Sequence, residues 1–218
     1  MWPAIGALRV WRRNLESWRP YAVFLTPGII AFTAMNSATF ETTIGSFTRM
    51  TEQNTYTAIL ATPCTVADVV AGDLLWAATK SAVAVTVVLA LTAAFGLVQS
   101  PLAVAVVPLG FVIGLLFGTL GMIVTAKAPS YDFFNYYFTF VFSVMFLFSG
   151  VFFPLATLPA WARALAWWLP LTHAVPLCRA LTSGTASPWL LGDALWIVTV
   201  LAGAFVLAER LVRRRLLV

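Results

Sequence analysis

Five long apolar stretches, separated by short polar connections, dominate this sequence. They cover about residues 21–44, 66–97, 102–126, 133–153 and 190–207. A bilayer core about 30 Å thick needs roughly 20 mostly apolar residues to be crossed by a helix. Because a helix pairs its own backbone polar groups, it is the form in which such stretches cross lipid. The sequence therefore predicts an all-α integral membrane protein, a polytopic helical bundle.

Composition supports this class and excludes others. Hydrophobic residues make up 61% of the chain and charged residues only 10%, whereas about a quarter of a soluble domain is charged. The two cysteines, Cys64 and Cys178, fit no metal or redox spacing. The positive charge gathers at the two ends of the chain, which is typical of cytoplasmic anchors and not of a nucleic-acid surface. These arginines are Arg9, Arg12, Arg13, Arg19, Arg210, Arg213, Arg214 and Arg215.

The two basic ends conflict with the number of spans. Five crossings place the termini on opposite sides, but the positive-inside rule favours the cytoplasm for both. With the C-terminus inside, residues 46–65 and 127–132 are cytoplasmic, and residues 99–101 and 154–181 are outside. Tyr21 then lies outside, two residues after Arg19. We therefore expect residues 1–20 to be an amphipathic segment and one span to be missing near residues 14–21.

Residues 154–181 are apolar but interrupted by prolines, so one straight helix is not expected there. Three tryptophans in this region favour the membrane–water boundary. The pattern predicts short interfacial or re-entrant helices on the outer side.

The longest cytoplasmic connection is residues 46–63, SFTRMTEQNTYTAILATP. It is expected to form a helix that ends before Pro63, with Tyr56, Ile59 and Leu60 on one arc and Phe47 and Met50 elsewhere. Two interpretations stay open: an interfacial connector, or a coupling helix that docks on a partner ATPase. The second assigns ATPase coupling to Arg49, Glu52, Tyr56 and Ile59.

Three charged side chains lie within or beside spans, and such charges usually face protein or water. Glu41 could brace the connector, whereas Asp73 and Lys80 are too far apart for a tight pair and should find partners on other helices. A proton relay through these three groups is the alternative. The ladder Gly110, Gly114, Gly118 and Gly121 predicts close helix packing.

Aromatic side chains crowd the fourth span, where they pack or line a path for an amphiphilic or sugar-bearing substrate. The outer end of this path is assigned to Phe148, Phe152, Phe153 and His173. A Ser149/His173 hydrolase lacks an oxyanion turn and an orienting acid, so the chain is not expected to be an enzyme. It contains no G-x-x-x-x-G-K-[ST] phosphate loop, so no cofactor is expected on this chain.

Several motifs, in order, resemble the nodulation-type (NodJ-like) lipo-oligosaccharide exporter permeases of the type-2 ABC exporter superfamily. They begin at Tyr21 and continue to Leu181: YAVFLTPGI, AMNSATFE, TYTAILATP, GDLLWAATK, SYDFFNY, FSGVFFPLATLP and PLTHAVPLCRAL.

The resemblance implies a six-span permease in the bacterial inner membrane that dimerises and binds two copies of a NodI-like ATPase, which holds the ATP and magnesium. It further implies an amphipathic N-terminal helix, of which residues 8–13 resemble the end, a coupling helix at residues 46–63 and outer re-entrant helices at 154–181. The expected function is ATP-driven export of an amphiphilic glycolipid, lipo-oligosaccharide or polysaccharide. The alternatives are a multidrug or antibiotic exporter on the same scaffold and a proton-coupled secondary transporter, although no internal repeat is seen.

Overall fold

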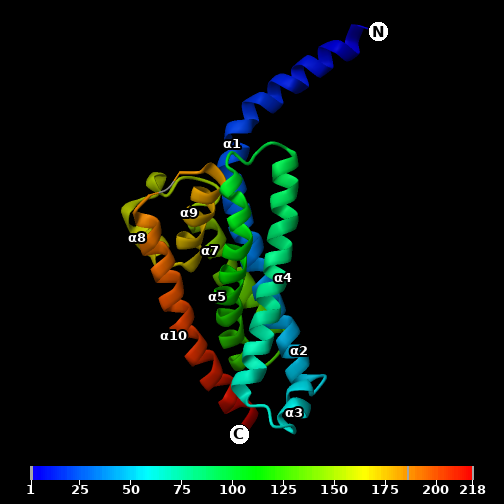
Figure 1. Ribbon diagram of the computed structural model, residues 1–218, viewed down its shortest axis with the longest axis vertical. Coiled ribbons are helices and arrows are strands. Elements are labelled where there is room, and N and C mark those ends of the chain that lie inside the picture. The colour runs from blue at the N-terminus through cyan, green and yellow to red at the C-terminus, as the bar shows by residue number, and fades with distance from the viewer. Residues whose placement is uncertain (1, 186, 218) are drawn as a thin grey trace.

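The computed structural model describes residues 2–185 and 187–217, with side chains described for residues 18–185 and 187–216. The described chain is an elongated helical bundle (Figure 1). Four of its helical segments are long and apolar enough to cross a membrane: Trp18–Thr51, Val66–Ala94, Pro101–Lys127 and Trp189–Leu216. A shorter apolar helix covers Asp132–Phe148.

The long segments are built from several elements. Helix α1 (Trp2–Phe40) continues through the π-helical turn η1 (Glu41–Gly45) into α2 (Ser46–Thr51). Helix α4 covers Val66–Ala94, and the 3₁₀ turn η2 (Pro101–Ala105) leads into α5 (Val106–Lys127). The last long helix is α10 (Trp189–Leu217). The predicted gap near residues 14–21 falls inside α1, and the hypothesis of a missing span there stays a prediction.

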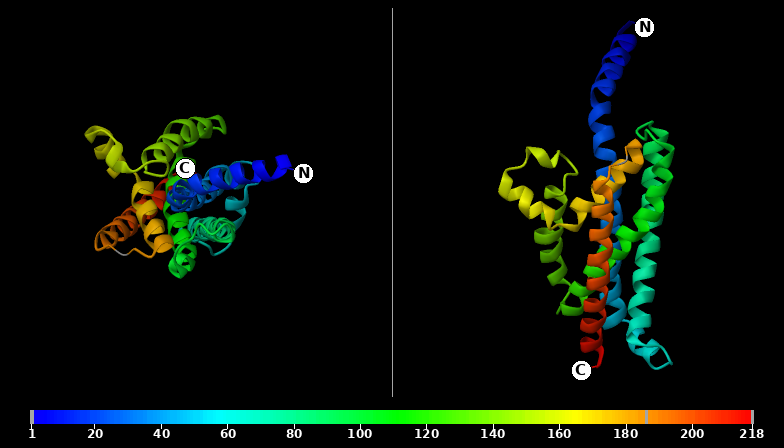
Figure 2. Two further views of the ribbon diagram at one scale, coloured as in Figure 1. Left: turned by 90° about the horizontal axis from the view of Figure 1, so that it is seen from above. Right: turned by 60° about the vertical axis from the view of Figure 1, so that its left-hand side comes forward.

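Successive segments run up and down the bundle, and the start of α1 and the end of α10 lie at its opposite ends (Figures 1 and 2). We call the end with α2, α3 (Thr55–Leu60) and the C-terminus the lower end, as drawn in Figure 1. The opposite, upper end holds the α4–η2 connection and the short helices α8 (Ala160–Trp167) and α9 (Pro170–Ser183). Residues 46–65 and 154–181 therefore occupy opposite ends of the bundle.

The fourth predicted span is shorter than the 133–153 expected from hydropathy. It consists of α6 (Asp132–Tyr136), the π-helical turn η3 (Tyr137–Phe142) and α7 (Ser143–Phe148). The helix stops there because Gly150 turns the backbone into the left-handed region, with φ of 75°. Pro154 then leads into a 3₁₀ turn, η4 (Leu155–Thr157).

The predicted single helix over residues 46–63 is two short helices, α2 and α3. The chain breaks at Glu52–Asn54, where Asn54 has a left-handed φ of 52°. This conformation is one that asparagine tolerates better than most residues. Because of the break, Met50 packs in the same cluster as Tyr56 and does not face elsewhere, as a continuous helix would require.

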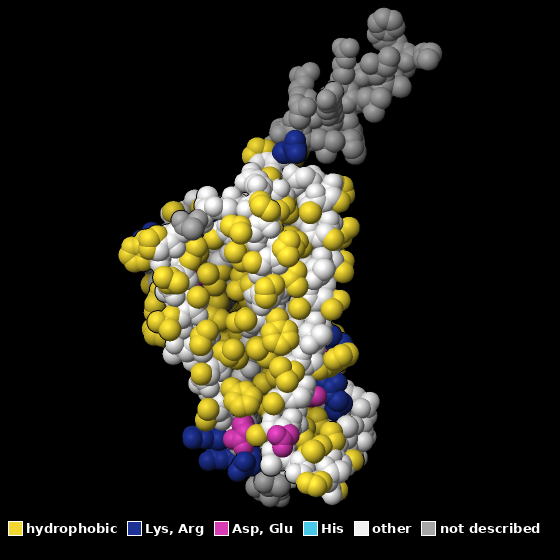
Figure 3. Space-filling model, in the orientation of Figure 1, with side chains coloured by type: hydrophobic (Ala, Val, Ile, Leu, Met, Phe, Trp, Pro, Cys, Tyr) yellow, Lys and Arg dark blue, Asp and Glu magenta, His cyan; other side chains and the backbone are white. Residues whose placement is uncertain are grey.

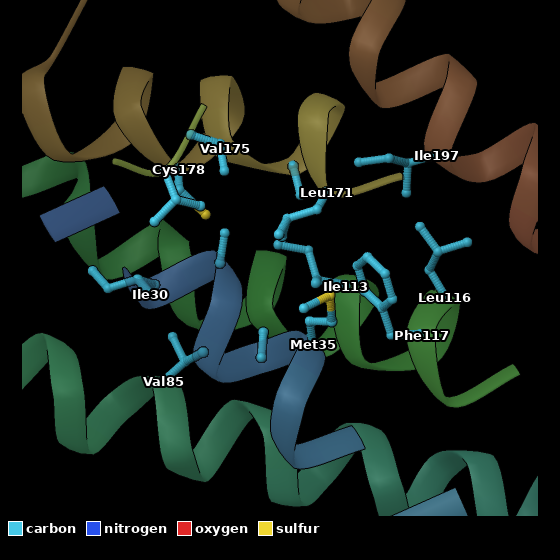
Figure 4. Close-up of a cluster of buried hydrophobic side chains, with 14 of the residues drawn as sticks. Ile30, Met35, Val85, Ile113, Leu116, Phe117, Leu171, Val175, Cys178 and Ile197 are labelled. Atoms are coloured by element: carbon cyan, nitrogen blue, oxygen red, sulfur yellow. The ribbon is translucent and has the colours of Figure 1, made fainter. Parts of the chain in front are cut away.

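The core lies where α1, α4, α5, α9 and α10 converge (Figure 4). The glycine ladder on α5 permits this contact: a Cβ at Gly114 would lie 2.9 Å from the Ala78 Cα, and one at Gly110 would lie 2.9 Å from Val85 Cγ2. The buried Ser81 hydroxyl donates to the carbonyls of Ala34 and Gly110, at 3.1 and 2.9 Å. The predicted packing role of these glycines is thus confirmed for the α4–α5 contact.

Candidate functional site

A network of charged and polar side chains joins the lower ends of α1 and α4 to the segment α2–α3. Its members come from four elements: Glu41 from η1, Ser46 and Arg49 from α2, Tyr56 from α3, and Asp73 and Lys80 from α4. Sequence reasoning placed all of these residues except Ser46 in two separate groups, one for coupling and one within the membrane. The fold brings both groups into one site.

Arg49 is the central cation. Its Nη1 donates to Glu41 Oε1 at 2.8 Å, and its Nη2 lies 3.2 Å from Asp73 Oδ2. The second oxygen of Glu41 accepts from Lys80 Nζ at 2.6 Å. Two cations thus face two carboxylates, so the network is formally neutral, as charges withdrawn from water need to be.

Asp73 is the central acceptor. Its Oδ2 accepts a hydrogen bond from Ser46 Oγ at 2.7 Å and another from the Tyr56 hydroxyl. The Tyr56 side chain is only 1% exposed. Burial, with the neighbouring Asp73 carboxylate, raises the pKa of the Tyr56 phenol. The phenol therefore stays a neutral donor that ties α3 to α4.

The π-helical turn places Glu41 in this network. Hydroxyls of Thr42 and Thr43 bond back to the carbonyls of Ala38 and Thr39, at 3.0 and 2.6 Å. A π-helical turn inside a longer helix is frequent at functional sites. Gly45 leaves the necessary room, because a Cβ there would lie 3.1 Å from Glu41 Oε1.

Two further residues assigned to coupling lie beside the network without joining it. Ile59 is partly buried and packs on the cluster that contains Tyr56 and Val70. Glu52 is exposed in the turn after α2. The segment therefore has a buried side that holds the spans and an exposed side, at Glu52, that is free to meet another protein.

The predicted brace between Glu41 and the connector is confirmed by the Arg49 contact. The expectation that Asp73 and Lys80 find partners on other helices is also confirmed. Sequence reasoning missed Ser46, although its position three residues before Arg49 puts both on one helix face.

The four residues assigned to the outer gate lie at the upper end. Phe148 ends α7, and Phe152 packs on Phe146 with ring centroids 4.7 Å apart. Phe153 is partly buried in the turn that follows. The assignment of Phe148, Phe152, Phe153 and His173 to an outer gate stays a prediction.

His173 is 5% exposed and has partners on both ring nitrogens. Nδ1 lies 2.7 Å from Asp193 Oδ1, and Nε2 lies 2.8 Å from the Trp167 carbonyl oxygen. Its ring also stacks on Trp196 with centroids 4.2 Å apart. Through these contacts, His173 on α9 connects α8 and α10. Sequence reasoning missed this role because it did not pair Asp193 with His173.

The match to known proteins agrees with this architecture. Residues 6–182 match the family model described as ABC-2 type transporter. The chain belongs to the ABC-2 type transporter family. As a member of this family with several membrane-length apolar helices, it is a multi-pass permease of the bacterial inner membrane.

Curated relatives of this ABC-2 permease share one name. The permease is 38% identical to Nodulation protein J of Rhizobium leguminosarum bv. viciae, and the match covers 90% of this chain and 76% of that protein. It is 39% identical to Nodulation protein J of Rhizobium leguminosarum bv. trifolii and 38% identical to that of Rhizobium meliloti (strain 1021), in both cases over 90% of this chain and 75% of the relative. No solved structure matches the chain significantly.

Proposed function

We propose that this ABC-2 permease exports an amphiphilic glycolipid, lipo-oligosaccharide or polysaccharide-type molecule, using ATP hydrolysed on a separate ATPase chain. The similarity to Nodulation protein J supports this cargo class, because the same motifs resemble lipo-oligosaccharide exporter permeases. The absence of a phosphate loop from the sequence supports a separate ATPase. We further propose that two copies of the permease assemble with two copies of this ATPase.

One observation carries the coupling mechanism: the segment α2–α3 is bonded directly to α1 and α4 through the Arg49–Asp73 network. A partner that pushes the exposed turn at Glu52 would move α3 as a rigid piece, since Tyr56 is buried against the spans. The network would then transmit the displacement to α4 through Asp73 and to α1 through Glu41. Movement of these two helices would open a path for the cargo.

The first test is purification of the tagged full-length protein in mild detergent, followed by subunit identification and an ATPase assay. We expect recovery of about equal amounts of a Walker-motif ATPase, with activity altered by candidate glycolipids. Recovery of the permease alone, with no nucleotide-hydrolysing partner, would count against the proposal and favour a secondary transporter.

The coupling segment is tested by two substitutions with different expected effects. Tyr56→Phe removes the hydrogen bond to Asp73 but keeps the buried ring, so the ATPase should still bind while transport falls. Glu52→Arg changes the exposed turn and should weaken ATPase binding itself. Gln53→Ala, at the neighbouring exposed position, is the control; wild-type behaviour of both Tyr56→Phe and Glu52→Arg would overturn the coupling assignment.

A further inference from the structure

A second polar site lies at the upper end of the bundle, far from the coupling network. It is a pocket of about 240 Å³ between α1, α9 and the connection from α4 to η2. Phe24 and Pro27 form part of its apolar wall, whereas Gln99, Ser183 and Thr185 provide polar groups. Among the described residues that line it, Arg179, on the last turns of α9, is the only charged one.

The charge of Arg179 is not balanced by an acid among the described residues. Its Nη2 donates to the Gly150 carbonyl at 3.3 Å, and its guanidinium stacks over the Phe24 ring at 4.4 Å. Its Nε is buried without a hydrogen-bond partner. Between residues 18 and 216, no described carboxylate forms an ion pair with Arg179, and Asp193, near the start of α10, is paired with His173. A partly buried cation with no carboxylate beside it is costly unless an anion compensates its charge.

The pocket is held in shape by the backbone. The Gln99 N–H donates to the Thr182 carbonyl at 3.0 Å, which fixes the connection to the end of α9. Gly184 permits this approach: it has φ of 74°, and a Cβ on it would lie 3.0 Å from Ser100 Oγ. At the rim, the Ser183 hydroxyl donates to the Arg179 carbonyl at 2.7 Å and lies 2.7 Å from the Thr185 hydroxyl. The polar groups are therefore set in position before any ligand arrives.

We propose that this pocket binds the oxyanion group of an amphiphile, such as a phosphate or sulfate. Arg179 would supply the charge and its forked donors, the side-chain amide of Gln99 would supply a further donor, and the apolar wall at Phe24 would contact the hydrophobic part of the ligand. Guanidinium is well suited to this task because its forked donors match an oxyanion. The pocket lies at the end of the bundle opposite the coupling segment, which places an anion site on the far side of the membrane.

The test measures thermal unfolding of the purified full-length protein in detergent, followed by the fluorescence of its nine tryptophans. A ligand that binds only the folded state raises the unfolding temperature in a concentration-dependent way. The probes are inorganic phosphate and short-chain phosphatidylglycerol, with short-chain phosphatidylcholine as the zwitterionic control, all at constant ionic strength. Stabilisation by phosphate would identify a site for free oxyanions, whereas stabilisation by phosphatidylglycerol alone would identify a lipid headgroup site; both support the proposal.

Arg179→Gln should weaken the apparent affinity about tenfold or more, since it removes charge-assisted hydrogen bonds. Arg163→Gln, at an exposed position on α8, is the matched control and should bind as the wild type does. If Arg179→Gln does not fold, Gln99→Glu keeps the contact of Arg179 with Phe24 but places a competing carboxylate at the pocket. No stabilisation by either anionic probe, or stabilisation that persists in both pocket variants, would overturn the proposal.

Discussion

Arg215, near the end of α10, donates hydrogen bonds to carbonyl groups at the lower end of α5. Its Nη1 donates to the carbonyls of Thr125 and Ala128, at 2.5 and 2.8 Å, and its guanidinium lies over the Phe47 ring at 5.3 Å. Carbonyls at the end of a helix lack internal partners, and a cation there is favourable. One arginine of the C-terminal cluster therefore stabilises the end of α5, in addition to the role of the cluster in membrane orientation.

We predict that Arg215→Met lowers the free energy of unfolding by about 1–2 kcal/mol, because it removes the donor to the Thr125 carbonyl in α5 and to the Ala128 carbonyl just after it. Arg214→Met removes the same charge at an exposed position and should change stability by less than about 0.5 kcal/mol. Unfolding in mixed detergent micelles measures both. Equal losses in the two variants would show that only net charge matters.

The ion pair between Glu41 and Lys80 stabilises the coupling network. The 2.6 Å contact joins a nearly buried carboxylate to a half-exposed ammonium group. Residues in one network show coupling energies of about 0.5–3 kcal/mol, and we predict about 1 kcal/mol here because Lys80 remains in part solvated. A double-mutant cycle of Glu41→Gln and Lys80→Met measures this term, and strict additivity would contradict it.

At the scale of helices, the close contact between α4 and α5 depends on the glycines of α5. A Cβ at Gly114 would meet Ser81 Cβ at 2.6 Å as well as the α4 backbone. The backbone cannot rotate away as a flexible side chain can, so the two helices must separate.

We predict that Gly114→Ala costs about 1–3 kcal/mol through overpacking. Gly203→Ala, on α10, introduces the same methyl group where nothing lies within 4 Å, and alanine favours the helix by up to about 1 kcal/mol. The two variants should therefore move the unfolding temperature in opposite directions. If Gly114→Ala left the unfolding temperature unchanged, the α4–α5 contact would be shown to relax around the added methyl group.

For the whole molecule, the arrangement of charge predicts orientation in the membrane. Apolar side chains cover most of the length of the bundle. On the face shown in Figure 3 most charged side chains gather at the lower end, and a basic side chain also lies at the upper end. The lower end also carries Arg210, Arg213 and Arg214, so the positive-inside rule places it in the cytoplasm.

The two native cysteines allow a direct test. Cys64 is exposed between α3 and α4 at the lower end, and Cys178 is buried. We predict that a membrane-impermeant maleimide modifies Cys64 in opened cells but not in intact ones. In a Cys64→Ser background, Ser187→Cys at the upper end should react in intact cells. Reaction of Cys64 from outside would invert the proposed topology.

The sequence alone determined the class of the protein, most of its spans and the residue types that matter. Length and hydropathy suffice for this because the bilayer dictates how many apolar residues each crossing needs. The glycine spacing on residues 110–121 likewise determined close packing, since it depends on one helix face.

Only the tertiary structure decided how these parts combine. It split residues 46–63 into two helices at Asn54 and joined Arg49, Tyr56 and Asp73 into one network, although Asp73 is 24 residues beyond Arg49 in the chain. It also left Arg179 without an acidic partner among the side chains described, while pairing Asp193 with His173. Such outcomes depend on which helices pack together and in which register along the bundle. Hydropathy locates the helices but does not predict how they pack, so it cannot predict the partners of a side chain.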